Sequence, residues 1–288
     1  MNHSTFKFLQ RYAQALYKRT SDRQRIQRYR CCECETTMSP STFSPWRGQK
    51  KRYLNRVVFG LLSRGMSINN TADELKVNRK TVARKLEAWG FYAASELNRI
   101  NREEHEQCRV IEFDDLETFE HTKCKPIAVT IAVESRTRRI LAIEVSPMQA
   151  KGKLAHKARE VYGRREDGRA AARARLFATL TDLVREDAVI KSDSNPHYAA
   201  DVKRYFPKAH HVTYQSRKGS LGGQGELKKT KFDPIFSLNH SCAMVRYNLA
   251  RLVRKTWCTT KRIDRLWLHL MLYALRHNQR IKNLTAQA

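Results

Sequence analysis

Three acidic residues stand where their side chains could take part in metal-dependent phosphate chemistry. Asp114 and Asp115 follow the run VIEF, and Asp193 follows the run AVIKS. Carboxylate oxygens are the ligands that Mg²⁺ prefers, and two-metal phosphoryl transfer requires several convergent carboxylates. Paired Asp residues after a strand are also common as a turn or a helix cap. The pattern alone leaves both interpretations open.

A third ligand is harder to place than the first two. Glu226, in GGQGELKK, lies shortly after a predicted strand, so a returning helix or loop could carry it over the strand ends. The alternative is an ordinary glutamate at a helix start, where the helix dipole favours it. Asn239 and His240 compete for the role, because amide and imidazole groups can also ligate metal or position a phosphate. We assign the third position to Glu226 and keep these two as alternates.

The elements that must position the acids are predicted to form an α/β domain over residues 107–288. Runs rich in Val and Ile predict a three-stranded meander, followed by helix, strand, helix and strand. The predicted strands are Arg109 to Leu116, Lys125 to Ser135, Arg138 to Val145, Ala188 to Ser192 and His210 to Tyr214, and the helices include Tyr198 to Tyr205. Antiparallel strands followed by a β-α-β unit favour a ribonuclease-H-like domain.

A second motif, SINNTADELKVNRKTVARKLEAWG, predicts a helix-turn-helix within a small helical domain over residues 51–93. Ser67 suits a helix N-cap, Val77 and Asn78 suit a turn, and a further helix can begin at Arg79. The apolar positions would clamp two helices together and leave a polar face for a DNA major groove. That face would carry Asn78, Arg79, Lys80, Arg84 and Lys85. The alternative is a basic helical hairpin packed for structural reasons alone.

The bulk composition points to a polyanionic partner. The formal net charge is +28 over 288 residues, which makes double-stranded DNA the expected partner. No apolar stretch is long enough to span a bilayer, and the N-terminus lacks the apolar core of a signal peptide. We therefore expect a cytoplasmic protein without a membrane anchor.

The first 50 residues predict a small basic module with a doubtful zinc site. Among seven cysteines only Cys31 and Cys34 have metal-ligand spacing. A closed tetrahedral site requires four ligands, whereas this stretch offers two, or three with Cys32. Free thiols beside a basic turn are therefore favoured over zinc binding, and no disulfide framework is expected.

These residues together resemble the DDE transposases of bacterial insertion sequences. IEFDDLETFEHTK resembles the first-aspartate motif of that family, which assigns the first catalytic role to Asp114 rather than Asp115. SDSNPHY resembles the second motif and assigns the second role to Asp193. The run RYNLARLVRKTWCTTKRIDRLWLHLMLYALRHN resembles the helical segment around and beyond the third acidic position in the smallest transposases of this group. Where the acid would precede that helix, this chain has Asn239 and His240, with Glu226 upstream.

The N-terminal half fits the same resemblance. RYRCCECETTMS is similar to the second half of a zinc ribbon, which these transposases join to a helix-turn-helix and a catalytic domain. The resemblance implies recognition of terminal inverted repeats, cleavage at the element ends and strand transfer to target DNA. It also implies Mg²⁺ or Mn²⁺ held by Asp114, Asp193 and Glu226, and a homo-oligomer assembled on DNA.

Two other functions are compatible with these residues. A DNA-binding regulator could use the α/β domain only as a scaffold, and its DNA binding would then survive loss of the acids and require no metal. A nuclease without strand transfer would share every site residue with a transposase.

Overall fold

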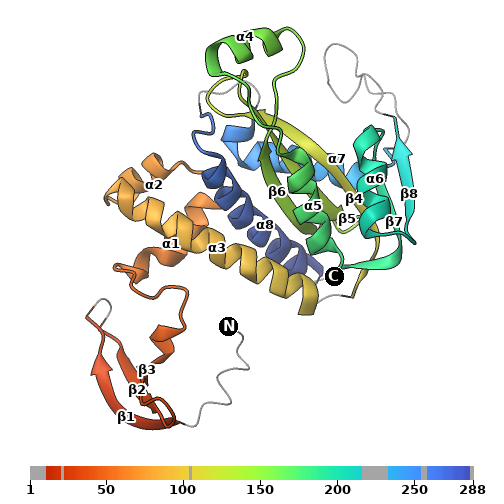
Figure 1. Ribbon diagram of the computed structural model, residues 1–288. Coiled ribbons are helices and arrows are strands. Elements are labelled where there is room, and N and C mark those ends of the chain that lie inside the picture. The colour runs from red at the N-terminus through yellow and green to blue at the C-terminus, as the bar shows by residue number, and fades with distance from the viewer. Residues whose placement is uncertain (1–10, 21–22, 104–105, 216–232, 254–257, 286–288) are drawn as a thin grey trace.

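The structure is a computed structural model that describes residues 11–20, 23–103, 106–215, 233–253 and 258–285 (Figure 1). Its strands are β1 (Arg11–Lys18), β2 (Arg25–Cys31), β3 (Thr37–Met38), β4 (Cys108–Phe119), β5 (Pro126–Glu134), β6 (Ile140–Pro147), β7 (Val184–Asp193) and β8 (His210–Tyr214). Its helices are α1 (Asn55–Leu62), α2 (Ile68–Glu74), α3 (Arg79–Glu103), α4 (Leu154–Tyr162), α5 (Arg169–Leu180), α6 (Pro196–Tyr205), α7 (Phe236–Asn248) and α8 (Ile263–Thr285).

A mixed five-stranded sheet forms the centre of the larger part of the molecule. Its strand order is β6-β5-β4-β7-β8. β4, β5 and β6 form an antiparallel meander, whereas β7 pairs parallel to β4 and β8 pairs parallel to β7. The prediction of a mixed α/β fold is confirmed, and all five predicted strands of this part lie in one sheet.

Alternate residues of β4 face two different layers of helices. Phe113 packs on Phe177 of α5 and Tyr198 of α6, with ring centroids 5.1 and 4.7 Å apart. Leu116 lies three residues further along the strand and therefore points to the other face, where it belongs to the core that includes α7 and α8. Figure 1 shows α5 and α6 against one face of the sheet and α7 behind the other. Because side chains alternate along a strand, the residues of β4 point in turn to one layer of helices and to the other.

The helices α1 to α3 share a core with α8 and the sheet. Ser67 caps α2 by accepting a hydrogen bond from the backbone N–H of Asn70, and α3 begins at Arg79 as predicted. α3 then continues to Glu103, so the domain boundary predicted at residue 93 lies inside this helix. Gly90 lies so close to α8 that an added Cβ would stand 2.3 Å from Leu268. The helices and the sheet are therefore packed together over a continuous apolar core.

The basic segment from Lys151 to Arg175 contains α4 and the first half of α5. One sequence prediction needs correction at this level. The first strand was expected to end at Leu116, but β4 continues to Phe119 because its pairing with β5 persists that far. In the described residues, no helix is long and apolar enough to cross a membrane.

The N-terminal segment forms a separate small sheet. β1, β2 and β3 pair antiparallel in that order. Cys31 is buried at the end of β2, whereas Cys32 and Cys34 are exposed in the turn that follows. No set of three or more potential metal ligands surrounds these thiols in the part of the chain that the structure describes.

Candidate active site

Asp114 and Asp193 lie side by side where two parallel strands separate. The last paired residues of β4 and β7 are Glu112 and Lys191, and each aspartate stands two residues further along its strand. Two residues of separation also keep the side chains on the same face as Glu112 and Lys191. The charge of Asp193 reaches Asp114 and raises its pKa. The structure thus brings together two of the three predicted carboxylates.

The environment of Asp114 favours its protonated form in the absence of a cation. Burial and then the charge of Asp193 raise the pKa of Asp114 to about 7. Its carboxylate accepts hydrogen bonds from the backbone N–H of Asp115 at 2.7 Å and from the hydroxyl of Tyr198 at 3.0 Å. These two donors oppose the shift but do not cancel it. The result is a buried carboxyl that requires a positive charge to be fully ionised at neutral pH.

Asp115 belongs to the opposite layer of the sheet. Its carboxylate accepts a hydrogen bond from the hydroxyl of Thr130 on β5. Burial raises the pKa of Asp115, whereas the positive charges of Arg173 and Arg169 on α5 lower it. Strand alternation places only Asp114 on the face of Asp193, whereas the hydroxyl of Tyr198 lowers the pKa of both Asp114 and Asp115.

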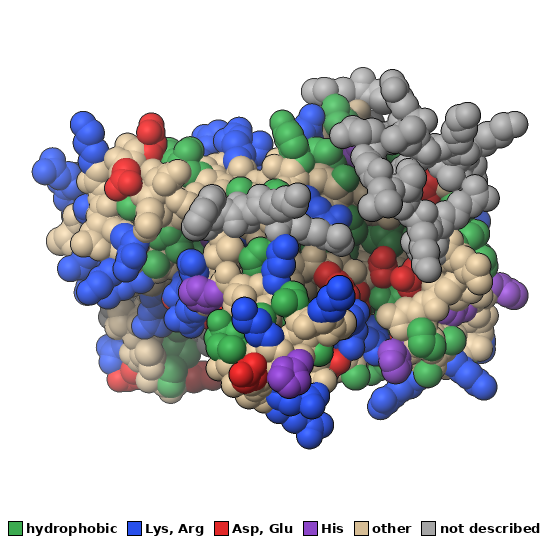
Figure 2. Space-filling model, turned by 90° about the horizontal axis from the view of Figure 1, so that it is seen from above, with side chains coloured by type: hydrophobic (Ala, Val, Ile, Leu, Met, Phe, Trp, Pro, Cys, Tyr) green, Lys and Arg blue, Asp and Glu red, His purple; other side chains and the backbone are tan. Residues whose placement is uncertain are grey.

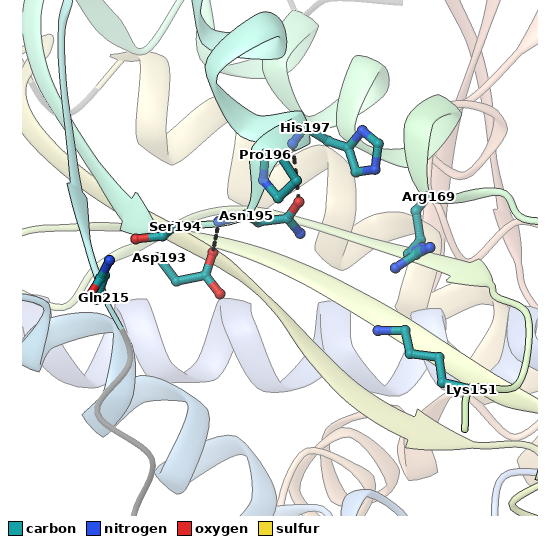
Figure 3. Close-up of a pocket in the computed structure, with 8 residues that line it drawn as sticks. All are labelled: Lys151, Arg169, Asp193, Ser194, Asn195, Pro196, His197 and Gln215. Atoms are coloured by element: carbon teal, nitrogen blue, oxygen red, sulfur yellow. Dashed lines mark hydrogen bonds between the residues drawn. The ribbon is translucent and has the colours of Figure 1, made fainter. Parts of the chain in front are cut away.

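A pocket of about 560 Å³ opens beside Asp193 (Figure 3). The carboxylate of Asp193 accepts a hydrogen bond from the backbone N–H of Asn195 at 3.0 Å, and Asn195 in turn caps α6. Lys151 and Arg169 extend toward Asp193 from the far side of this pocket. Asp114 does not line this pocket. The pocket offers one carboxylate and two cations to an incoming anionic group.

Helix α7 covers the face of the sheet that carries Asp114. Glu112 is 2% exposed and accepts hydrogen bonds from the backbone N–H of Leu238 at 2.8 Å and from the hydroxyl of Ser135 at 2.7 Å. One turn further along α7 stands Cys242. Burial and then the charge of Asp114 raise the pKa of the Cys242 thiol to about 12. Glu112 therefore fixes the first turn of α7 on the sheet, and Cys242 lies next to Asp114.

The third ligand is not placed by the described residues. Glu226 lies outside them. The side-chain amide of Asn239 is exposed and donates a hydrogen bond to Asp233 at 2.9 Å. His240 contacts Arg138 at 3.2 Å, in the turn between β5 and β6. Within the described ranges, no group of three or more His, Cys, Asp or Glu residues could hold a metal ion.

The two alternates differ in their position on α7. Asn239 stands one turn before Cys242 and shares its flank, because residues three apart lie on neighbouring positions of a helix surface. His240 lies two residues from Cys242 and therefore on another side of the helix. The turn that it contacts follows Glu134, which pairs with Ile111, three residues before Asp114 on β4. The structure does not bring His240 to the aspartate pair.

Four of the five side chains predicted to face DNA are exposed, and one is not. The exposed residues are Asn78, Arg79, Lys80 and Arg84. The side chain of Asn78 also caps α3, because it accepts a hydrogen bond from the backbone N–H of Lys80 at 2.8 Å. Lys85 is 2% exposed, and its ammonium donates hydrogen bonds to the side chain of Asn55 and the backbone carbonyl of Lys50. The expectation that Lys85 is free to face a groove is therefore wrong.

Sequence reasoning missed three residues of the site. Tyr198 was assigned only to a helix, although the aromatic residue in SDSNPHY was a signal for a contact with the acids. Glu112 and Cys242 gave no signal, because the partners that define them come from distant parts of the chain.

Comparisons with known proteins assign no family to this chain. No model of a known protein family matches the chain, and no curated protein matches it at a significant level. The candidate site is therefore interpreted from its own residues.

Proposed function

We propose that this chain is a DNA-binding enzyme that cuts and rejoins DNA with carboxylate-held divalent metal, as the transposase of an insertion sequence does. The observation that carries the proposal is the convergence of Asp114 and Asp193 at the point where the parallel strands β4 and β7 separate. Two like charges in a partly buried site cost free energy unless a cation neutralises them. Pairs of carboxyl groups with a raised pKa occur mainly at functional sites, where the chemistry requires them.

The residues at the site fit a divalent cation. Both side chains offer carboxylate oxygens, which Mg²⁺ and Mn²⁺ prefer, and the raised pKa of Asp114 results from burial and from Asp193. Asp114 and Asp193 would hold the metal, with Glu226 as the proposed third ligand. Bound there, the metal would supply positive charge that activates the attacking oxygen and stabilises the charge on the reacting phosphate.

The other residues of the site orient the acids and the substrate. The Tyr198 hydroxyl and the Asp115 backbone N–H fix the carboxylate of Asp114, and the Asn195 backbone N–H fixes that of Asp193. Lys151 and Arg169 are placed to contact the phosphate backbone of DNA that enters the pocket beside Asp193.

The strand order supports a ribonuclease-H-like catalytic domain. The antiparallel meander β6-β5-β4 continues into parallel strands β7 and β8, and a helix connects these two. Asp114 lies on the central strand and Asp193 on the strand beside it. Carboxylates on neighbouring strands of such a sheet can converge without any loop having to fold over them.

The DNA-binding part of the proposal rests on charge and on helices α2 and α3. The two helices are joined by a short turn, and the first two turns of α3 present Arg79, Lys80 and Arg84 to solvent, as a recognition helix of a helix-turn-helix would. Figure 2 shows Lys and Arg side chains spread over the face seen from above, whereas acidic side chains form only small groups. Such a surface favours a polyanion as a partner.

The proposal is tested by incubating the full chain with DNA that carries element ends, in Mg²⁺ and in EDTA. We expect metal-dependent nicking and joined products in Mg²⁺ only. Salt-dependent DNA binding without cleavage in Mg²⁺ or Mn²⁺ would favour the regulator instead. Cleavage without joining would favour the nuclease.

A further inference from the structure

A second pocket, of about 300 Å³, lies under helix α4 and is lined by basic side chains. The described residues that line it include no acid, and its charged residues are Lys125, Arg159, Arg164 and Arg165. Arg165 forms an ion pair with Glu120 at 2.9 Å, and both side chains are about one-fifth exposed. Three cations remain without an acidic partner within 4 Å in the described part of the chain. Such a pocket attracts an anion.

The pocket is built by the local backbone rather than by chance exposure of long side chains. Gly163 ends α4 with a φ of 72°, a left-handed conformation that favours glycine. The chain therefore turns back sharply, so that Arg159 in the last turn of α4 and Arg164 after it line the same pocket. Lys125 completes the wall from the turn between β4 and β5, and its ammonium lies 4.4 Å from the ring centroid of Tyr162.

The segment that builds this pocket also contributes to the pocket beside Asp193. Lys151 and Arg169 line the first pocket, and the residues between them carry α4. Two ion pairs hold this segment on β4 and the turn after it, because Lys151 pairs with Glu117 at 2.7 Å and Arg165 pairs with Glu120. One chain segment thus contributes basic side chains to both pockets, Lys151 and Arg169 to the first and Arg159 and Arg164 to the second. Figure 1 shows α4 beyond the ends of the meander strands.

We infer that Lys125, Arg159 and Arg164 bind the phosphate backbone of DNA at a distance from the reacting phosphate. β4 continues for five residues beyond Asp114, which is about 17 Å at roughly 3.4 Å per residue. Because B-DNA rises about 3.4 Å per nucleotide along each strand, that length corresponds to about five base pairs. The pocket would therefore hold the duplex about half a helical turn from the acids. The inference rests on the proposed function, since that function supplies DNA as the partner.

The test compares the salt dependence of DNA binding by the full chain and by a triple variant, Lys125→Gln, Arg159→Gln and Arg164→Gln. Fluorescence anisotropy with a labelled linear duplex measures the affinity over a range of salt concentrations in EDTA. Each lost phosphate contact lowers the slope of log affinity against log salt by about 0.9, so we expect a fall of about 2.7. A second triple variant, Lys125→Arg, Arg159→Lys and Arg164→Lys, retains the charges and should retain the slope.

The control variant removes the same charge at the opposite ends of the strands. Arg109, Arg185 and Lys208 are exposed at or just before the starts of β4, β7 and β8, and all three are changed to Gln. The inference would be overturned by an unchanged slope in the first triple variant, by an equal fall of the slope in this control, or by a fall in the charge-retaining variant. Each of these results would leave the proposed function standing. If the parent chain does not bind DNA, both are wrong.

Discussion

The hydroxyl of Tyr198 donates a hydrogen bond to the carboxylate of Asp114 at 3.0 Å, although 84 residues separate them in the chain. Tyr198 is buried, and its ring packs on Phe113, the residue before Asp114. Helix α6 is therefore fixed to β4 both by apolar contact and by a bond to one of the acids. Since Asn195 caps the same helix and bonds to Asp193, α6 orients both carboxylates.

Replacing Tyr198 with Phe should move the acid limb of the cleavage profile to higher pH. The hydroxyl stabilises the ionised carboxylate, so its loss raises the pKa of Asp114 further. A net hydrogen-bond contribution of about 1 kcal/mol corresponds to roughly 0.7 pH units. Rates of DNA cleavage measured from pH 5 to pH 9 provide the check. Tyr205→Phe on the same helix is the control, and equal profiles for the two variants would show that the Tyr198 hydroxyl does not act on Asp114.

Asp114→Asn should stabilise the metal-free fold in a pH-dependent way. The pKa of Asp114 is raised from 3.8 to about 7, so the folded state binds the proton more tightly than the unfolded chain does. Ionisation therefore lowers the free energy of unfolding as pH rises from about 4 to about 7, by up to about 4 kcal/mol. The amide in the variant does not ionise, so the variant's free energy of unfolding does not fall in this pH range for that reason. The Oδ1 of the amide can still accept both hydrogen bonds.

Thermal unfolding of the parent and of Asp114→Asn in EDTA, at pH 4 and at pH 8, measures this difference. The gain in melting temperature should be small at pH 4 and fully developed at pH 8. A gain of the same size at both pH values would contradict the raised pKa of Asp114 that burial and the charge of Asp193 produce.

Glu112→Gln should destabilise the fold without changing any side chain of the aspartate pair. In the variant the amide oxygen can accept from Leu238 and the amide N–H can donate to the Ser135 hydroxyl, so two charge-assisted hydrogen bonds become weaker neutral ones. The expected loss is about 1–3 kcal/mol in the free energy of unfolding, measured by urea denaturation. Glu117→Gln on the same strand removes only the exposed pair with Lys151 and should cost at most about 1 kcal/mol. Equal losses in the two variants would contradict the anchoring of α7 by Glu112.

Arg79→Ala with Arg84→Ala should weaken DNA binding and leave stability unchanged, whereas Lys85→Met should do the reverse. The two arginines are exposed on α3, and each lost contact costs roughly 1–3 kcal/mol at a base or about one unit of salt slope at a phosphate. Lys85 is buried, and its removal leaves Asn55 without its donor. Anisotropy and thermal unfolding of both variants distinguish these effects. Unchanged affinity and salt slope in the arginine variant would remove the helix-turn-helix assignment.

Local patterns predicted the elements of the sheet but not their long-range contacts. The bounds of β8 and the starts of α2 and α3 were correct, because apolar periodicity and capping residues act over a few positions. The end of β4 was missed because the strand was predicted to stop at Leu116, whereas pairing with β5 extends it to Phe119. The burial of Lys85 depends on Asn55, 30 residues earlier, which no pattern on α3 encodes.

The candidate site shows the same division. Asp114 and Asp193 could be selected from strand-end positions and from the resemblance to transposases, and parallel pairing of β4 with β7 brings them together. The layer to which Asp115 belongs follows from strand alternation once the register is known. The contact of Glu112 with Leu238 spans 126 residues and depends on how α7 packs, so the sequence carried no signal for it.

The most direct measurement is the rate of Mg²⁺-dependent DNA cleavage by the parent, Asp114→Asn, Asp193→Asn and Asp115→Asn under identical conditions. Asp115 is the matched control, because it is the same residue type on the same strand but faces α5. Glu226→Gln and Asn239→Ala, assayed alongside, identify the third position by which of them loses cleavage.

Cleavage should be abolished in Asp114→Asn and Asp193→Asn, with DNA binding retained, and should remain close to the parental rate in Asp115→Asn. Parental rates in both Asp114→Asn and Asp193→Asn would contradict the claim that these two carboxylates hold the catalytic metal.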